Sequence, residues 1–495
     1  MYKLHLILKY LLKRRIAWVS LIAVMLCTLM VIVVISVMGG WLRMFKESFH
    51  DLTGDIVVSR RSLTGFPHYQ EMIDRIEKLP EVAGAAPTLQ TFGLVNINNS
   101  IRDGVQVIGL PLDKMNHINA FRKSLHRQYQ EPLELENDPN TPPEQRAELR
   151  KQIEAPATFD KPYPAETYKE FMPDAKVDVT KWPGIITGAG VIGIGKDKEG
   201  HVHRPAGVYT AWVRLTVLGL HEDSTSLDVN EKVERAYWIV DDSRTGVWQY
   251  DSQTVYVPFE ILQKDLRMDE QTVTDAATGQ KIIEPARTTD IRIGLKPGLG
   301  EATLWATRDK IAEIVHDVLG ADSDQGMDPV RVQTWMQFNA KYIAAIENEK
   351  VLVVVLFGII SIVAIFLIFC IFYMIVVEKT RDIGIIKSVG ATSGGVAGIF
   401  LGYGLAIGIV GSFLGLLGGY LIVHNINFLH SELSKLMGIT IWNPEVYAFD
   451  IIPHTMNPVE VSVIMAIAVI ASVIGALVPA IRAASLHPVE ALRWE

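Results

Sequence analysis

The amino-acid sequence predicts an α-helical membrane protein with four transmembrane helices and a large mixed α+β extracytoplasmic domain inserted between helices 1 and 2. Three observations predict this fold class. Four long apolar runs interrupt a chain of 495 residues that is otherwise rich in charge. Each run has the roughly 20 residues that a helix needs to cross a hydrocarbon core. Lysine and arginine residues also lie beside these runs, at the ends that would all be cytoplasmic if the chain crosses the membrane four times.

The four predicted transmembrane helices cover residues 16–42, 351–377, 393–423 and 458–481. The first run has no charged residue from Ile16 to Leu42. It is longer than the apolar part of a secretory signal peptide, and no A-x-A-like cleavage site ends it. We therefore predict a retained helix, which tilts or projects beyond the bilayer.

Basic residues set the predicted orientation, because cytoplasmic loops of membrane proteins carry an excess of them. They precede the first helix, lie between the second and third, and follow the fourth. These residues are Lys3, Lys9, Lys13, Arg14 and Arg15, then Lys379, Arg381 and Lys387, then Arg482 and Arg493. The N-terminus (1–15), the loop 378–392 and the tail 482–495 are therefore predicted to be cytoplasmic. Residues 43–350 and the short loop 424–457 lie outside.

Small residues four apart in the third run predict close packing of the third and fourth helices. Glycine at such spacing lets helix backbones approach one another in lipid. The glycines are Gly394, Gly398 and Gly402, then Gly404 and Gly408, then Gly411, Gly415 and Gly419.

The large domain reads as strands alternating with amphipathic helices. β-branched segments predict strands at 55–59, 105–110, 212–220, 254–257 and 290–295. Helices are predicted at 67–79 and 301–319, and Thr334 with Gln337 forms a capping box before the second apolar run. Residues 122–180 are polar and proline-rich, which predicts a surface insertion outside the core with one short helix near 143–153.

Composition excludes several classes of protein. A net charge of −8 without a basic stripe argues against nucleic-acid binding. Cys27 and Cys370 both fall in apolar runs, where they form neither a disulfide framework nor a metal knuckle. No charged residue lies deep in a predicted helix, so an ion-coupled pathway is not expected.

No catalytic or cofactor-binding constellation is found either. Gly188 to Gly193 matches G-x-G-x-x-G, but a polar turn and not a helix follows it, so the helix N-terminus that binds phosphate is missing. His201 and His203 alone are a weak metal signal. We predict a non-catalytic chain that holds no metal and no cofactor of its own.

The cytoplasmic loop 378–392 is the most informative stretch. A short helix from about Arg381 to Val389 is predicted, with Asp382 near its start, Lys387 near its end and Gly390 as its stop. Its apolar side is predicted to comprise Ile383, Ile386 and Val389. Such a helix suits docking to a cytoplasmic partner; the alternative is an interfacial helix that lies on lipid.

Two segments resemble a known superfamily. The loop Glu378–Thr392 and the tail Pro479–Arg493 are similar to the corresponding parts of MacB/FtsX-type permeases of ABC transporters. Within that superfamily the chain resembles the lipoprotein-releasing LolC/LolE-type permeases. The narrower resemblance rests on Val332–Asn339, on Gly246–Ser252 with Val255–Pro258, and on Leu79–Pro87.

The resemblance implies a permease of the bacterial inner membrane with both termini in the cytoplasm. A separate ABC ATPase would bind ATP and Mg²⁺, and a second permease, identical or paralogous, would complete the assembly. The coupling loop seated on the ATPase would use Lys379, Arg381, Asp382, Ile383, Gly384, Lys387 and Gly390. ATP-driven motion would be passed to the outer domain.

The resemblance also implies a substrate. Lipoproteins would leave the outer leaflet through an apolar cavity, whose residues the sequence does not identify, toward a periplasmic carrier. Two alternatives stay open: export of another amphiphile, or an FtsX-like signalling scaffold that activates a periplasmic hydrolase.

Overall fold

The computed structural model describes residues 15–97, 100–101, 104–173, 175–196, 202–205, 207–220, 227–274, 281–320, 329–437 and 451–487. These residues form two compact units. The helical unit comprises the described residues up to Met44, from Tyr342 to Met437 and from Ile451 onward, and the sheet domain comprises those from Phe45 to Lys341. The predicted cytoplasmic residues Lys3, Lys9, Lys13, Arg14 and Arg493, and the weak metal candidate His201, lie outside the described residues.

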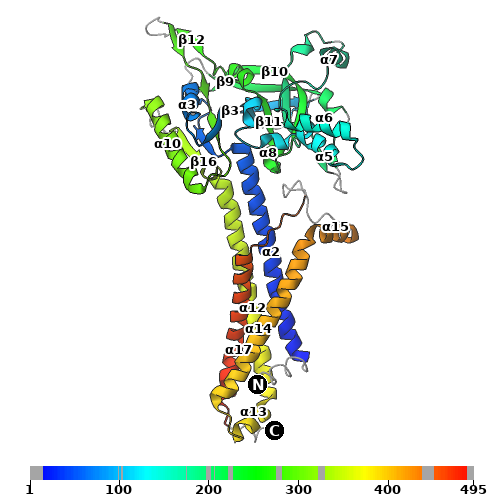
Figure 1. Ribbon diagram of the computed structural model, residues 1–495, viewed down its shortest axis with the longest axis vertical. Helices are drawn as coiled ribbons and strands as arrows, with labels where there is room; N and C mark the ends of the chain where they lie inside the picture. The colour runs from blue at the N-terminus through cyan, green and yellow to red at the C-terminus, as the bar shows by residue number, and fades with distance from the viewer. Residues whose placement is uncertain are drawn as a thin grey trace. The chain divides into compact units, whose positions relative to one another are not determined.

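The helical unit contains four helices that are long and apolar enough to cross a membrane. They are α2 (Arg15–Thr53), α12 (Ala340–Glu378), α14 (Ser393–His424) and α17 (Pro458–Ser485). Two shorter helices flank α14, namely α13 (Thr380–Ser388) before it and α15 (Ile426–Met437) after it (Figure 1). The bounds of α2 and α12 cross the division between the two units.

Glycines on α14 allow the close packing that their spacing predicts. A Cβ atom added to Gly404 would lie 2.6 Å from the Cβ of Ala476 on α17, and one on Gly415 would lie 2.7 Å from the carbonyl oxygen of Met25 on α2. Both distances are shorter than carbon contacts allow, so α14 contacts its neighbours through bare backbone. Gly398, by contrast, faces open space.

A ten-stranded sheet forms the centre of the sheet domain, in the order β16-β1-β15-β3-β5-β11-β6-β10-β9, with β4 paired to β3. Its strands are β1 (Ile56–Ser59), β3 (Val82–Ile97), β4 (Ser100–Ile101), β5 (Val105–Leu110), β6 (Gly184–Gly188), β9 (Trp212–Leu220), β10 (Leu227–Ser243), β11 (Thr254–Pro258), β15 (Asp290–Leu295) and β16 (Arg331–Thr334).

The long strand β3 belongs to two parts of this sheet. Its first half pairs with β15, and its second half pairs with β5 on one side and β9 on the other. Strands β3, β5, β11, β6, β10 and β9 therefore close into a ring, while β16, β1 and β15 extend from it. Six short strands form separate pairs: β2 (Phe66–Pro67) with β14 (Arg287–Thr288), β7 (Gly195–Lys196) with β8 (Val202–His203), and β12 (Gln271–Thr274) with β13 (Lys281–Glu284).

Helices cover this framework at several places. They are α3 (Tyr69–Ile76), α4 (Leu112–Met115), α8 (Trp248–Gln253), α9 (Phe259–Asp265), α10 (Glu301–Leu319) and α11 (Trp335–Phe338). Apolar side chains of α3 and α10 pack against β1 and β15 in one core, which includes Met72, Ile293 and Ile311. A second core includes Val107, Ile185 and Val217 from strands of the ring. The mixed α/β character that the sequence predicts is therefore confirmed.

The segment 122–180 differs from its prediction. One short helix was expected, but the structure contains α5 (Glu131–Asn137), α6 (Pro143–Glu154) and α7 (Ala165–Phe171). The expectation that it stays outside the core is wrong, because Tyr168 and Val179 are buried against Trp238 of β10. The Trp238 indole N–H also donates to the Val179 carbonyl oxygen at 2.8 Å. Two buried side chains, Tyr168 and Val179, thus attach the largely polar segment 122–180 to Trp238 of β10.

Single turns complete the domain. They are η1 (Phe121–Ser124), η2 (His126–Gln130), η3 (Val179–Lys181) and η4 (Val208–Thr210). After β6 the glycine motif forms turns and then β7, with no helix between them. A Cβ on Gly190 would lie 2.8 Å from the Cα of Ser252, so this glycine permits close backbone packing. Within the described residues, no helix therefore follows the glycine motif directly.

Candidate coupling site

The loop between α12 and α14 folds into the short helix α13. Asp382 lies in its first turn and Lys387 in its last, so each charge lies at the end whose dipole it complements. The Lys379 ammonium group pairs with the Asp382 carboxylate three residues later. These charges favour a helix at this position.

Gly390 ends α13 in a left-handed conformation. Its φ angle is +106°, which a side chain would strain. The Gly390 N–H donates to the Lys387 carbonyl oxygen at 3.0 Å, and the Ala391 N–H donates to the Ile386 carbonyl oxygen at 3.1 Å. This pair of bonds is a Schellman motif, which satisfies the last carbonyl groups and turns the chain toward α14.

Ile383 fixes α13 to the ends of the long helices. Its side chain is 3% exposed and packs in one cluster with Val376 of α12, Val396 of α14 and Ala483 of α17. Gly384 is buried beside it. These two predicted site residues therefore face the helical unit.

Lys387 also anchors the helix. Its ammonium group donates to the carbonyl oxygens of Ala484 and Leu486, both at 2.7 Å. Those carbonyl groups lie at the C-terminal end of α17, where a positive charge offsets the helix dipole. Lys387 thus joins α13 to the last turn of α17 and is not a free group at the surface.

The outward face of α13 comprises Arg381, Ile385, Ser388 and Val389. Ile385 is 47% exposed and Val389 is 86% exposed. Two exposed apolar side chains beside an arginine form a small surface suited to a groove on a protein partner.

The predicted apolar side of α13 divides in the structure, because Ile383 points inward and Val389 outward. Sequence reasoning missed Ile385 as an exposed position. A signal for it exists, since Arg381, Ile385 and Val389 are spaced by four and so share one helix face. The part that any of these residues plays in docking stays a prediction.

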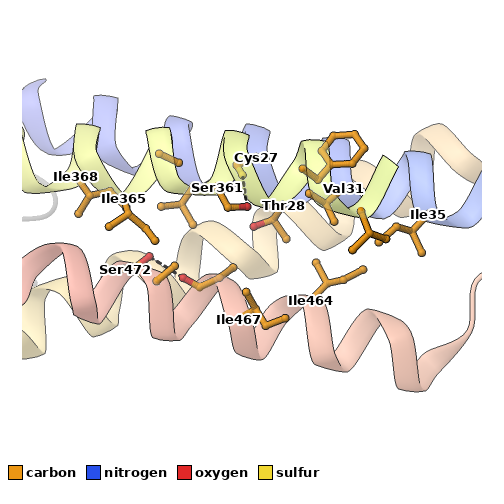
Figure 2. A pocket seen from close by; sticks show the side chains of 17 residues that line it. Cys27, Thr28, Val31, Ile35, Ser361, Ile365, Ile368, Ile464, Ile467 and Ser472 are labelled. Carbon is orange, nitrogen blue, oxygen red and sulfur yellow. Dashed lines mark hydrogen bonds between the residues drawn. The ribbon is translucent and has the colours of Figure 1, made fainter. Parts of the chain in front are cut away.

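A cavity of about 200 Å³ lies within the helical unit between α2, α12 and α17 (Figure 2). Apolar side chains dominate its lining, among them Val31, Ile365 and Ile467. The Thr28 hydroxyl group is buried at its wall and has no hydrogen-bond partner among the described residues. An apolar space of this kind suits hydrocarbon better than a charged solute.

An ion pair lies one helical turn beyond the cavity. The Lys350 ammonium group on α12 lies 3.1 Å from the Glu460 carboxylate on α17. Val354 and Ile464, which line the cavity, follow these two residues by one turn on their respective helices. The pair therefore holds α12 and α17 together at that end.

Two neighbouring strands of the sheet are connected along the chain to the long helices α2 and α12. β1 follows α2, and β16 leads through α11 into α12. The two strands are antiparallel neighbours, with Ile56 opposite Thr334. The predicted capping box is confirmed: the Gln337 N–H donates to the Thr334 hydroxyl group at 3.4 Å, and the Gln337 side chain accepts from the Thr334 N–H at 3.1 Å.

Asp55 connects this junction within the sheet domain. Its carboxylate accepts the Leu295 N–H at 2.7 Å and lies 2.9 Å from the His50 ring nitrogen. Its carbonyl oxygen accepts the Trp335 N–H at 2.9 Å. One residue thus links the last turn of α2, strand β15 and the start of α11.

Three buried carboxyl groups in the sheet domain have raised pKa values. Burial raises the pKa of Asp241 and Asp290 to about 6, and that of Asp251 to about 7. N–H donors oppose this rise in part; Asp241 accepts the backbone N–H groups of Arg127 at 2.8 Å and Gln128 at 3.1 Å. Asp241 thereby attaches the segment 122–180 to β10, a structural task.

No metal centre is found in the part of the chain that the structure describes, because no three His, Cys, Asp or Glu side chains gather there. The sequence prediction of a chain without a metal or cofactor of its own stays a prediction.

Comparison with known proteins connects the helical unit to a family. The family described as FtsX-like permease C-terminal matches residues 354–488. The chain is 32% identical over 167 residues to the lipoprotein-releasing system transmembrane protein LolC of Xylella fastidiosa, and 32% identical over 168 residues to that of Neisseria meningitidis serogroup B. Each match covers 34% of this chain and 40% of the relative.

Two further similarities were found. The LolE protein of Haemophilus influenzae is 29% identical over 119 residues, which is 24% of this chain and 29% of that protein. The solved periplasmic region of MacB from Actinobacillus actinomycetemcomitans aligns with 59% of this chain and 93% of its own, with 6% identity and a TM-score of 0.29.

The resemblance that the sequence predicts is thereby confirmed at the level of a domain. The helix α13 and three of the four long helices fall partly or wholly within the matched region, while the matched curated relatives extend well beyond their aligned parts. This chain carries an FtsX-like permease domain over residues 354–488 and is a sequence relative of the LolC and LolE permeases.

Proposed function

We propose that this chain is the permease subunit of an ABC transporter in a bacterial inner membrane. A separate ATPase binds the outward face of α13 and hydrolyses ATP with Mg²⁺. A second permease, identical or paralogous, completes the assembly. Both termini lie in the cytoplasm, and the sheet domain lies on the opposite side of the membrane.

One observation carries this proposal. Within an FtsX-like permease domain, α13 is fastened to the ends of three long helices by Ile383 and Lys387 while it exposes Ile385 and Val389. A push on the exposed face would therefore move the helix ends, because the other face of α13 is packed against them. Basic residues near this end support its cytoplasmic placement.

Extraction of lipoproteins from the outer leaflet is the work that we propose. Support comes from the relatives, whose names assign them to a lipoprotein-releasing system. The cavity between α2, α12 and α17 adds physical support, because acyl chains need an apolar lining. The pairing of β1 with β16 supplies a route by which motion of α2 and α12 reaches the sheet domain.

Co-purification in mild detergent tests the proposal. The test variant carries Ile385→Glu and Val389→Glu, which place two charges on the outward face of α13 without disturbing the buried Ile383. The matched control carries Ile283→Glu and Phe92→Glu, at exposed apolar residues of the sheet domain. We expect the wild type and the control to retain an ABC ATPase and acylated lipoproteins, and the test variant to lose at least about 90% of the ATPase.

Other outcomes decide between the alternatives. An ATPase that co-purifies with a soluble periplasmic hydrolase and without lipoprotein would favour the signalling scaffold. An ATPase with a different acylated or amphiphilic molecule would favour export of that molecule. Absence of any ATPase from the wild-type sample would overturn the permease proposal itself.

A further inference from the structure

The helix that follows α14 carries an apolar stripe on its surface. In α15, Ile426, Leu429, Leu433 and Leu436 recur at spacings of three or four residues and so share one helix face. Leu429, Leu433 and Leu436 are 46%, 40% and 85% exposed. The rest of the described residues therefore cover this stripe only in part.

The polar side of α15 is attached to the helical unit. The Asn427 side chain accepts the Ile452 N–H at 2.8 Å and donates to the Ile452 carbonyl oxygen at 3.4 Å. The segment containing Ile452 is itself attached to α2, because the Thr455 N–H donates to the Ser36 carbonyl oxygen at 2.9 Å. Since Asn427 lies on the opposite side of the helix from Leu436, the apolar stripe points away from these attachments.

The position of α15 relative to α14 is also fixed by the chain. Asn425 ends α14, and its carbonyl oxygen accepts the Leu429 N–H at 2.9 Å, so α15 begins directly where α14 stops. Figure 1 shows α15 lying across the end of α14 rather than continuing it. If α14 spans a bilayer, its C-terminal end, where α15 begins, lies at or beyond one edge of the hydrocarbon.

We infer that α15 lies in the membrane surface at this end of α14, with its apolar stripe among the acyl chains and the side that carries Ser431 and Ser434 toward water. The inference rests on the proposed placement of α14 in a membrane and adds the site where the chain binds the lipid surface. It gives α15 a physical task, because a helix held at the interface fixes the depth of α14.

The charges of α15 determine which lipid surface it suits. Lys435 pairs with Glu432 at 2.9 Å, and these two opposite charges cancel. Burial of the apolar stripe therefore holds it to the surface, and anionic headgroups are not needed. A zwitterionic bilayer is a sufficient partner.

Spin labels in the full chain test the inference. In a background with Cys27→Ser and Cys370→Ser, single cysteines replace Leu433, Leu436, Ser431 or Ser434 on α15, and Leu417 within α14 serves as the control. The chain is reconstituted in phosphatidylcholine vesicles, with and without 30% phosphatidylglycerol. Collision rates with oxygen, which concentrates in lipid, and with a water-soluble nickel complex are measured for each label.

We expect labels at 433 and 436 to collide with oxygen at least about threefold more than with the nickel complex, and labels at 431 and 434 to show the reverse. The pattern is expected to be the same in both lipid mixtures. Nickel access on both sides of α15, or access of neither reagent at 433 and 436, overturns the inference. Absence of lipid contact at 417 would instead overturn the membrane placement of α14, so the two failures are distinguishable.

Discussion

The two units of the molecule differ in how they divide close packing between glycines and large side chains. In the helical unit, α14 contacts its neighbours through glycines, and a Cβ on Gly404 or Gly415 would overlap atoms of α17 or α2. In the sheet domain, large side chains such as Trp238, Tyr256 and Ile293 are fully or almost fully buried between strands and helices. The difference follows from the solvent, because the hydrophobic effect drives burial in water but not in lipid.

This comparison predicts that adding atoms at the glycine contacts of α14 disrupts the helical unit. Gly404→Leu should abolish its folded state, because the new side chain would have to occupy the position of Ala476 and the Ser472 carbonyl oxygen. Size-exclusion chromatography of the detergent-solubilised chain measures the loss as the disappearance of the monodisperse peak. Gly398→Leu is the matched control on the same helix, since nothing lies within 4 Å of that position. Equal tolerance of both variants would contradict packing through backbone.

Removing atoms should damage the sheet domain most. Ile293→Ala deletes part of a side chain that is 0% exposed in the core under α3 and α10, and should lower the free energy of unfolding of this domain by about 2–5 kcal/mol. Denaturant unfolding followed by tryptophan fluorescence checks the effect. The matched control Ile283→Ala, at a residue that is 65% exposed, should change the free energy by less than about 0.5 kcal/mol. A similar loss in both variants would show that burial does not determine the cost.

The last expected effect is a dependence of stability on pH, and it concerns the sheet domain alone. Burial raises the pKa of Asp251 from its ordinary value of 3.8 to about 7, so the folded domain binds this proton more tightly than the unfolded chain. Its contribution is therefore most favourable at low pH and is lost as the pH rises from about 4 to about 7. Asp251→Asn removes this proton, and the midpoint of thermal unfolding should then vary less over that interval. An unchanged pH profile would place the titration elsewhere, for example at Asp241 or Asp290.

Several elements of the sheet domain could be predicted from the sequence because local pattern and tertiary role agree. The strands at 105–110, 212–220 and 290–295 and the helix at 301–319 have the predicted bounds. Each contains a continuous β-branched or amphipathic pattern that ends in a turn signal. Their order in the sheet could not be predicted, since β3 pairs with three strands that lie far apart in the chain.

The segment 122–180 and the helix α13 show where sequence reasoning fails. Mean polarity suggested that 122–180 is a surface excursion, but Tyr168 and Val179 suffice to bury it against Trp238. In α13, composition identified Asp382, Lys387 and Gly390 correctly as helix-end residues, because their roles are local. The directions of Ile383, Ile385 and Lys387 depend on α12, α14 and α17, which only the folded structure brings together.

The antiparallel pair of β1 and β16 has a mechanical consequence. α2 enters β1 at Ile56, and α11 leaves β16 at Thr334, so both connections lie at the same end of the two-stranded ribbon. A force that separates these two connections would break the hydrogen bonds between β1 and β16 one after another, starting at the Ile56–Thr334 end. A force that acts on both connections in the same direction, along the strands, would instead load the hydrogen bonds between β1 and β15 in shear. These bonds would then resist the force together. In the proposed permease, the ribbon would therefore transmit motion that α2 and α12 share, and its hydrogen bonds would break under motion that separates them.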